Sequence, residues 1–259
     1  MSINSFLVSM YMVVKADWKI MVGNLSLKPK LKKALVMFRR DPSEVKRVLV
    51  EQGFELVSEN PDFVVCYGGD GTVLFAERAF PEIPKLVIKT SRACRMYDYK
   101  LEDLAKLLSK IKSGDFEIHS EMKLVAEAKG RTLVGLNEVQ VHLKLPIYAV
   151  RFSLFVDGKE YDNLIGDGVI VAAPFGSTAY YSATGGKSFD EGIGISFNNL
   201  HYKKQDSVVV SDSSVVKIAI SRGPAWLLAD NNEDFIELDA GDSVTIKKSG
   251  SVANFIYFP

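Results

Sequence analysis

The hydrophobic pattern of this chain changes character at Gly114. Before Gly114, short apolar runs of strand length alternate with amphipathic stretches of helix length, and after it the apolar runs mostly have strand length. Strands that alternate with helices are typical of a parallel sheet, whereas a series of short strands is typical of a sandwich or barrel. The sequence therefore predicts an α/β N-terminal domain with a small parallel sheet, followed by a β-rich, sandwich-like C-terminal domain.

The N-terminal domain is expected to cover residues 33–115, with residues 1–32 as an N-terminal extension. Buried strands are predicted at residues 34–38, 63–67 and 86–88. Helices are predicted after Asp41-Pro42, after the glycines at 68–71 and over residues 101–111. Gly53 and Gly114 follow two of these helices, where glycine commonly ends a helix.

The C-terminal domain is expected to cover residues 116–259, although its last strands may return to the first domain. A hairpin is predicted from residues 117–129 and 132–143, joined at Gly130-Arg131. Asp157-Gly158 is a strong two-residue hairpin turn. Further strands are predicted at residues 169–173, 208–210, 215–220, 235–238 and 244–247.

The charge balance excludes some partners. Lys plus Arg and Asp plus Glu both number 32, so no global field attracts nucleic acid or an anionic membrane. The two cysteines, Cys66 and Cys94, make no Cys-x-x-Cys pair, so neither a zinc site nor a disulfide framework is indicated. The apolar run at residues 6–14 is too short to span a bilayer, and no cleavage site follows it. We expect a cytoplasmic protein.

Gly68-Gly69-Asp70-Gly71-Thr72 is the sharpest local motif, between a predicted strand and a predicted helix. Glycines let the backbone approach a ligand closely, and the free N–H groups at a helix start favour phosphate. Asp70 would repel a phosphate, so it is better explained as a general base or a magnesium-facing group. The alternative is an ordinary strand-to-helix turn with a capping aspartate.

A second motif follows Asp167. A predicted strand leads into the small-residue segment 174–186, which includes Ser177, Thr178, Ala179, Tyr180 and Tyr181. Its hydroxyls suit polar ligand groups, and its tyrosine rings could stack on a purine. Tyrosine pairs are more often part of a core, so the tyrosines alone indicate a site only weakly.

A third motif is Asn137-Glu138, a polar pair within an apolar, strand-like run. Asparagine both donates and accepts hydrogen bonds, and glutamate accepts them from hydroxyls, which suits a sugar diol. Taken alone, the pair is better explained as part of an exposed edge strand.

Together, in this order and spacing, the three motifs resemble those of the NAD kinase family. The resemblance covers roughly residues 33–259 and implies an α/β domain followed by a β-sandwich. It implies transfer of phosphate from ATP or polyphosphate to the adenosine-ribose 2′-hydroxyl of NAD. It also implies Mg²⁺ or another divalent metal with the donor, no separate protein metal site, and a homodimer or homotetramer.

The resemblance also implies residue roles. Asp70 corresponds to the base, Gly68, Gly69, Gly71 and Thr72 to phosphate contacts, and Gly71 also to the acceptor site. Asn137 and Glu138 correspond to ribose contacts, Asp167 to a contact at the nicotinamide end, and Thr178, Ala179 and Tyr180 to adenine contacts.

Two segments depart from the family pattern. The family's glycine-containing stretch after the third strand is replaced by residues 88–96, where Lys89, Arg92 and Arg95 either clamp donor phosphates or form a solvated basic face. The family's Asp-Gly-Gln hairpin reads Asp230-Asn231-Asn232, and asparagine tolerates the left-handed turn that glycine would otherwise supply.

Three other functions explain the motifs less well. A diacylglycerol-type lipid kinase shares the glycine turn but gives no reason for segment 167–186. A non-catalytic NAD(P)-sensing module gives no reason for Asp70. A Rossmann dehydrogenase is disfavoured because no Gly-x-Gly-x-x-Gly follows a strand.

Overall fold

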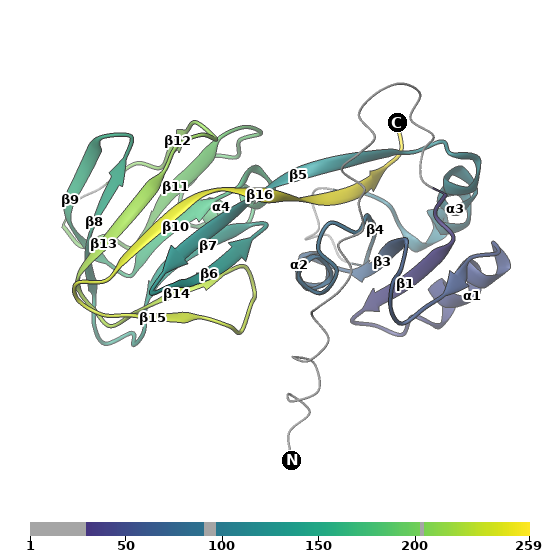
Figure 1. The fold of residues 1–259 in the computed structure, drawn as a ribbon, viewed down its shortest axis with the longest axis horizontal. Coiled ribbons are helices and arrows are strands. Elements are labelled where there is room, and N and C mark those ends of the chain that lie inside the picture. Colours follow the sequence, from purple (N-terminus) through teal and green to yellow (C-terminus); the bar gives the residue numbers. More distant parts are fainter. Residues whose placement is uncertain (1–29, 91–96, 203–204) are drawn as a thin grey trace, which may run out of the picture. The chain divides into compact units, whose positions relative to one another are not determined.

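The N-terminal half of the chain is a parallel sheet with helices on both faces. The structure, a computed structural model, describes residues 30–90, 97–202 and 205–259. The elements of this half are β1 (Lys33–Phe38), α1 (Ser43–Glu51), β2 (Glu55–Leu56), β3 (Phe63–Gly68), α2 (Asp70–Ala79), β4 (Lys85–Lys89), the 3-10 helix η2 (Leu101–Asp103) and α3 (Leu104–Ser113). The strands pair in parallel in the order β2-β1-β3-β4 (Figure 1).

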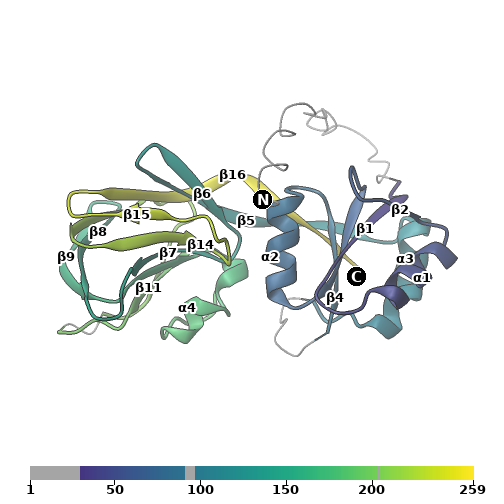
Figure 2. The ribbon, with the colours of Figure 1, turned by 90° about the horizontal axis from the view of Figure 1, so that it is seen from below.

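The alternation of side chains along β3 explains why both faces of this sheet are covered. Phe63 and Val65 pack with the apolar stripes of α1 and α3, whereas Val64 and Cys66 pack with α2. All four side chains are fully buried. A strand buried on both faces is expected to be a continuous apolar run, as this one is. Figure 2 shows α2 on one side of the sheet and α1 and α3 on the other.

The C-terminal half is a sandwich of antiparallel strands. Its elements are β5 (Glu117–Ala128), β6 (Arg131–Gly135), β7 (Glu138–Leu143), β8 (Val150–Val156), β9 (Lys159–Gly166), β10 (Gly168–Ala172), η3 (Pro174–Gly176), α4 (Tyr180–Ala183), β11 (Ile193–Asn198), β12 (Val208–Val210), β13 (Val216–Arg222), β14 (Ala225–Ala229), β15 (Ile236–Leu238) and β16 (Ser243–Tyr257). One sheet has the order β12-β11-β10-β7-β14-β15, and it faces β16, β13, β8 and β9 across a single apolar core. The predicted fold class is confirmed.

The long strands β5 and β16 run through both halves (Figure 1). They pair with each other from Glu117↔Tyr257 to Glu127↔Thr245. One end of β16 continues the parallel sheet, with Phe255 opposite Lys85 of β4, and the other end pairs with β13 in the sandwich. The two halves therefore share one continuous sheet, and a domain division between residues 115 and 116 stays a prediction.

One predicted strand is divided in the structure. Residues 132–143 were expected to form a single strand, but β6 and β7 belong to different sheets and the chain turns between them at Leu136-Asn137. The turn of the first hairpin lies at Lys129-Gly130, one residue earlier than expected, and both residues have positive φ. The hairpin turn at Asp157-Gly158 is confirmed, again with positive φ at both positions.

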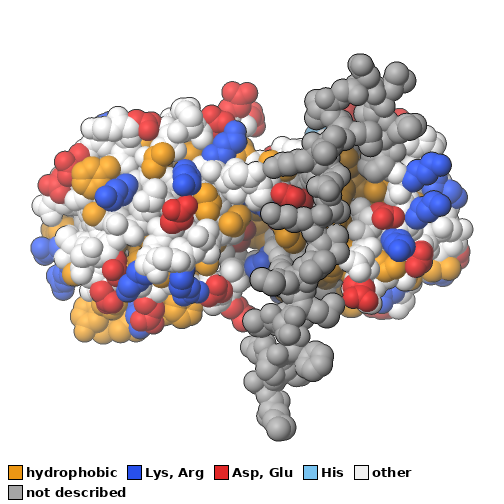
Figure 3. Space-filling view, viewed as in Figure 1, with side chains coloured by type: hydrophobic (Ala, Val, Ile, Leu, Met, Phe, Trp, Pro, Cys, Tyr) orange, Lys and Arg blue, Asp and Glu red, His pale blue; other side chains and the backbone are white. Residues whose placement is uncertain are grey.

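The surface carries both signs of charge. On the face drawn in Figure 3, basic and acidic side chains are interspersed over the described residues, as the equal numbers of the two signs lead one to expect. Among the described helices, none is both long and apolar enough to cross a membrane.

Candidate active site

The glycine-rich turn joins β3 to α2. Gly68 is the last residue of β3, Gly69 is the extended N-cap and Asp70 is the first residue of α2. The Gly68 carbonyl accepts a hydrogen bond from the Thr90 backbone N–H at 3.0 Å, which fixes the turn against the end of β4. A Cβ atom on Gly68 would overlap the side chain of Thr72, so this position requires glycine. The predicted strand–turn–helix context of the motif is confirmed.

The start of α2 combines a positive helix end with a carboxylate. The first N–H groups of a helix have no partner within the helix and carry a partial positive charge. Asp70 and Gly71 are partly exposed there. The Thr72 hydroxyl is buried and has no hydrogen-bond partner among the described residues. This end of α2 can therefore receive a phosphate beside a carboxylate.

Asp230 explains why the chain turns between β6 and β7. Its carboxylate accepts backbone N–H groups from Leu136 and Asn137, both at 2.8 Å, and from Glu138 at 3.2 Å. Asp230 itself has a left-handed φ of 48° in the turn between β14 and β15. Burial raises the pKa of Asp230, and the three N–H bonds and the charge of Arg78 oppose that rise. The three bonds hold the predicted Asn137-Glu138 pair in a defined backbone conformation.

Glu138 is a buried acid. The residue is only 6% exposed, and Oε2 of its carboxyl has no hydrogen-bond partner among the described residues. Burial, with the nearby charge of Asp230, raises the pKa of Glu138 to about 8. At neutral pH the carboxyl is therefore mainly protonated and can donate a hydrogen bond as well as accept one.

The turn after β14 also reaches the glycine-rich motif. The Asn231 side-chain amide donates to the Gly71 carbonyl at 3.2 Å, and its oxygen accepts from Arg78 at 3.1 Å. Asp230 and Asn231 thus contact the Asn137-Glu138 pair and the start of α2, respectively. Two predicted site segments that lie far apart in sequence are connected by this one turn.

The segment after β10 packs against Asn137. The Asn137 carbonyl accepts a hydrogen bond from the Ala173 N–H at 2.9 Å. Gly176 lies so close to the Asn137 backbone that a Cβ atom there would overlap it, so this glycine is required by close approach. Ser177 is buried, while Thr178 and Ala179 are partly exposed just before α4. The segment after β10 therefore contacts the Asn137-Glu138 pair, which the Asp230-Asn231 turn connects to the glycine-rich motif.

Asp167 and Tyr180 are bonded to two consecutive residues, Asn199 and Asn198, at the end of β11. The Tyr180 hydroxyl accepts a hydrogen bond from the Asn198 amide at 2.9 Å, and the Asp167 carboxylate accepts one from the Asn199 amide at 3.2 Å. Tyr180 is partly buried, whereas Tyr181 is 1% exposed and packs edge-on against Phe189. Tyr181 is a core residue, and Tyr180 is the more exposed of the two tyrosines.

Sequence reasoning missed four residues that hold the site together. In the sequence, Asp230 and Asn231 stand out only as a departure from a family motif, and Asn198 and Asn199 belong to none of the three motifs. The sequence Asp230-Asn231-Asn232 was the available signal for Asp230, since Asp and Asn side chains in turns often bond to the backbone.

The atypical basic stretch is described only at its start. Lys89 ends β4 opposite Gly68 and forms an ion pair with the exposed Asp98. Arg92 and Arg95 lie outside the described residues, as does Cys94. The proposed clamp on donor phosphates therefore stays a prediction.

Comparison with known proteins places the chain among nucleotide-modifying enzymes. The family described as the ATP-NAD kinase C-terminal domain matches residues 136–258. An NAD kinase from Methanopyrus kandleri is 30% identical over 203 residues, which cover 76% of this chain and 73% of the relative. A bifunctional NADP phosphatase/NAD kinase from Methanococcus maripaludis is 29% identical over 209 residues, but the match covers only 37% of its length.

Two solved structures share the fold. A yeast NADH kinase complexed with NADH has a TM-score of 0.78 and 16% identity, covering 90% of this chain and 85% of the other. An NAD kinase from Archaeoglobus fulgidus in complex with ATP has a TM-score of 0.74 and 24% identity, with 87% and 93% covered. At these identities the likeness concerns the fold. The sequence match to the Methanopyrus enzyme, together with the three connected motifs, identifies this chain as a kinase that belongs to the NAD kinase family.

Proposed function

We propose that this chain transfers a phosphoryl group from ATP or polyphosphate to the 2′-hydroxyl of the adenosine ribose of NAD, giving NADP. The observation that carries the proposal is the Asp70 carboxylate at the start of α2. Asn231 bonds the next residue, Gly71, and the adjacent Asp230 bonds the segment of Asn137 and Glu138. A phosphate at the helix end and a ribose at Asn137-Glu138 would bring the donor and the hydroxyl to one place. The yeast NADH kinase complexed with NADH and the Archaeoglobus NAD kinase in complex with ATP support this choice of ligands.

In the proposed reaction, Asp70 accepts the proton of the 2′-hydroxyl. The ribose oxygen forms a bond to the donor's terminal phosphorus as the bond from that phosphorus to the bridging oxygen breaks, and the bridging oxygen leaves with the electron pair. The N–H groups of Gly69 and Gly71 and the unpaired hydroxyl of Thr72 stabilise charge on the transferred group. Protonated Glu138 donates a hydrogen bond to the ribose, and Asn137 completes that contact.

A divalent metal fits this arrangement as a companion of the donor. Among the described residues, no three His, Cys, Asp or Glu side chains gather as a metal site. Mg²⁺ commonly binds through substrate phosphates, waters and one or two carboxylates, and Asp70 supplies a carboxylate of this kind. When bound, the metal would neutralise charge on the donor phosphates.

The remaining predicted contacts complete the proposal. Thr178, Ala179 and Tyr180 would contact adenine, and Asp167 the nicotinamide end. Asn198 and Asn199 support these assignments because they orient Tyr180 and Asp167. We also propose a homodimer or homotetramer in the cytoplasm, which light scattering and cell fractionation would test.

The test is a matrix of donors and acceptors combined with Asp70→Asn. ATP and polyphosphate are each offered with NAD, NADH and a diacylglycerol, and NADP(H) and phospholipid products are measured. Asp70→Asn should lower kcat by about 10²–10⁴ while NAD still binds, because a general base acts mainly in the transition state. A variant that keeps more than half the wild-type kcat would remove Asp70 as the base, and phosphorylation of the lipid alone would refute the substrate.

A further inference from the structure

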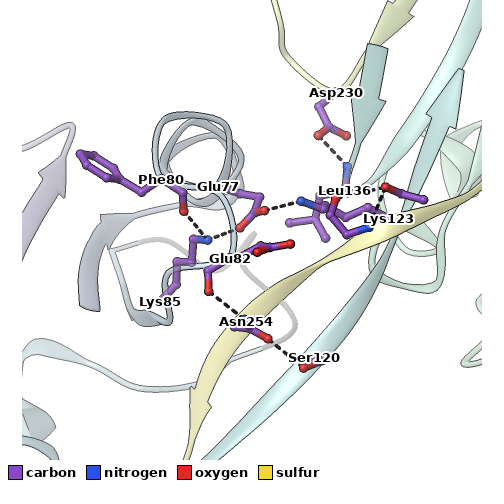
Figure 4. Close-up of polar contacts among 11 residues, drawn as sticks. Glu77, Phe80, Glu82, Lys85, Ser120, Lys123, Leu136, Asp230 and Asn254 are labelled. Carbon is purple, nitrogen blue, oxygen red and sulfur yellow. Dashed lines mark hydrogen bonds and ion pairs between the residues drawn. The ribbon is translucent and has the colours of Figure 1, made fainter. Parts of the chain in front are cut away.

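Glu77 is a buried carboxylate held between two lysines. It lies on α2, and its Oε1 accepts a hydrogen bond from Lys123 at 2.6 Å while its Oε2 pairs with Lys85 (Figure 4). The side chains of Lys85, Lys123 and Glu77 are 0%, 5% and 6% exposed. Both carboxylate oxygens are therefore engaged, each by a lysine from a different strand.

Burying the three charged groups of this cluster costs desolvation free energy. Two ammonium groups face one carboxylate, and burial lowers the pKa of Lys85 against the attraction of Glu77. Apolar side chains of similar volume often stabilise a core as well as or better than a buried ion pair. What the ion pairs add is direction, because charged hydrogen bonds fix orientation more closely than apolar contacts do.

The element that the cluster orients is α2, which carries Asp70. Glu77 follows Asp70 by seven residues, and two helical turns bring positions i and i+7 to the same face. Any rotation or sliding of α2 that displaces Glu77 from its lysines also displaces Asp70. Near its start the helix also carries the exposed bond from Asn231 to the Gly71 carbonyl.

The opposing lysine belongs to the strand that leads to the other half of the site. Lys123 lies on β5, which forms a hairpin with β6, and β6 runs into the turn at Asn137-Glu138. The long strands β5 and β16 also hold the loop after α2. Asn254 of β16 donates to the Glu82 carbonyl at 2.7 Å and accepts from Ser120 of β5 at 2.8 Å (Figure 4).

We propose that Glu77, clamped by Lys85 and Lys123, is a positioning residue that sets the rotation and height of α2 and thereby places the Asp70 carboxylate against the acceptor site. This inference rests on the proposed role of Asp70 as the base. Lys85 ties the helix to β4, and Lys123 ties it to β5 and so to the acceptor segment.

The test uses Lys123→Met, which removes the bond to β5 but leaves Glu77 and Lys85 as a neutral pair. A misplacement of about 1 Å can cost about 10² in rate, so we expect kcat to fall by about 10–100-fold. The KM for NAD should stay within about twofold, because the acceptor contacts are untouched. Lys123→Arg, which can still donate to Glu77, should recover most of the rate. If Lys123→Met does not fold, Lys123→Gln is measured in the same way.

Two matched controls separate positioning from general destabilisation. Lys248 lies on β16, and Lys248→Met removes its exposed ion pair with Asp212, which should leave kcat unchanged. Leu108→Ala opens a cavity under α3, away from α2, and lowers the denaturation midpoint without moving Asp70. If Leu108→Ala lowers kcat as much as Lys123→Met does, the positioning role is overturned.

A double-mutant cycle separates this inference from the proposed function. Adding Lys123→Met to Asp70→Asn should lower kcat no further, since a misplaced base and an absent base have the same consequence. If Asp70→Asn retains activity, the proposed base is wrong. If Asp70→Asn loses activity but Lys123→Met keeps the wild-type kcat, or if the two losses multiply in the double variant, the base stands and the positioning role of Glu77 is refuted.

Discussion

Asp230 and Asn137 are connected by a hydrogen bond from the Asn137 backbone N–H to the Asp230 carboxylate, 2.8 Å long. The same carboxylate also accepts hydrogen bonds from the backbone N–H groups of Leu136 and Glu138. Asp230→Ala should therefore leave three backbone donors without their partner. A buried donor left unpaired costs about 1–3 kcal/mol, so we expect a loss of at least about 2 kcal/mol in unfolding free energy. Urea denaturation would measure it.

Asp234→Ala is the matched control for this substitution. Asp234 lies on the same connection and makes an exposed ion pair with Arg131, and exposed pairs contribute little. Equal losses for Asp230→Ala and Asp234→Ala would contradict the role assigned to Asp230. Asp230→Asn, which keeps one acceptor oxygen, should fall between the two.

The buried acid Glu138 predicts a pH dependence of stability. Its pKa is about 8 in the folded protein and near 4.5 in the unfolded chain, so the folded state binds the additional proton between these values. The unfolding free energy should therefore fall as pH rises from about 4.5 to 8, by up to about 1.4 kcal/mol per pH unit from this group. Glu138→Gln should lack that part of the slope. Parallel curves for wild type and variant, from urea denaturation at a series of pH values, would show that the group is not perturbed.

Tyr180 offers its ring to a ligand while Asn198 holds its hydroxyl. Stacking on a base is worth about 1–3 kcal/mol, so Tyr180→Ala should raise the KM for NAD about tenfold or more. Tyr180→Phe keeps the ring and loses only the bond to Asn198, so its KM should rise much less. Steady-state kinetics with varied NAD decides between stacking and a purely structural role, for which KM would not change in either variant.

Lys89 ends β4 beside Gly68 and forms an ion pair with the exposed Asp98. A donor phosphate could replace Asp98 as the partner of Lys89. If Lys89 holds donor phosphates, Lys89→Met should raise the donor KM about tenfold and spare the KM for NAD. Asp98→Asn removes the competing carboxylate, so the donor KM should stay the same or decrease. A Lys89→Met enzyme with wild-type donor kinetics would return Lys89 to the solvated-face interpretation.

The elements that sequence predicted correctly are those whose local pattern and tertiary environment agree. β3 is an unbroken apolar run, and it is buried on both faces. β11 was missed because Gly194 and Ser196 interrupt its pattern. Gly194 is required there since the rings of Phe189 and Tyr181 lie against it, a reason visible only in three dimensions.

Other differences arise from contacts between distant residues. β14 reads Ala-Trp-Leu-Leu-Ala, a composition that favours a helix, yet pairing with β7 and β15 makes it a strand. The break after β6 depends on Asp230, which lies more than ninety residues further along the chain. The site residues themselves could be predicted because glycine turns and polar pairs stand out locally, whereas the groups that hold them could not.

The place of β16 in the sheet sets the order in which the protein can be completed as it leaves the ribosome. Ile256 and Phe258 pack with β1, β3, α1 and α3. The core of the half that is synthesised first therefore lacks these two side chains until β16 and Phe258 have been synthesised. Contacts between residues this distant form slowly and leave apolar surface exposed meanwhile. The half that carries Asp70 can therefore complete its core only after the sandwich has been translated. A nascent chain stalled before β16 should bind chaperones and have no partial enzyme activity.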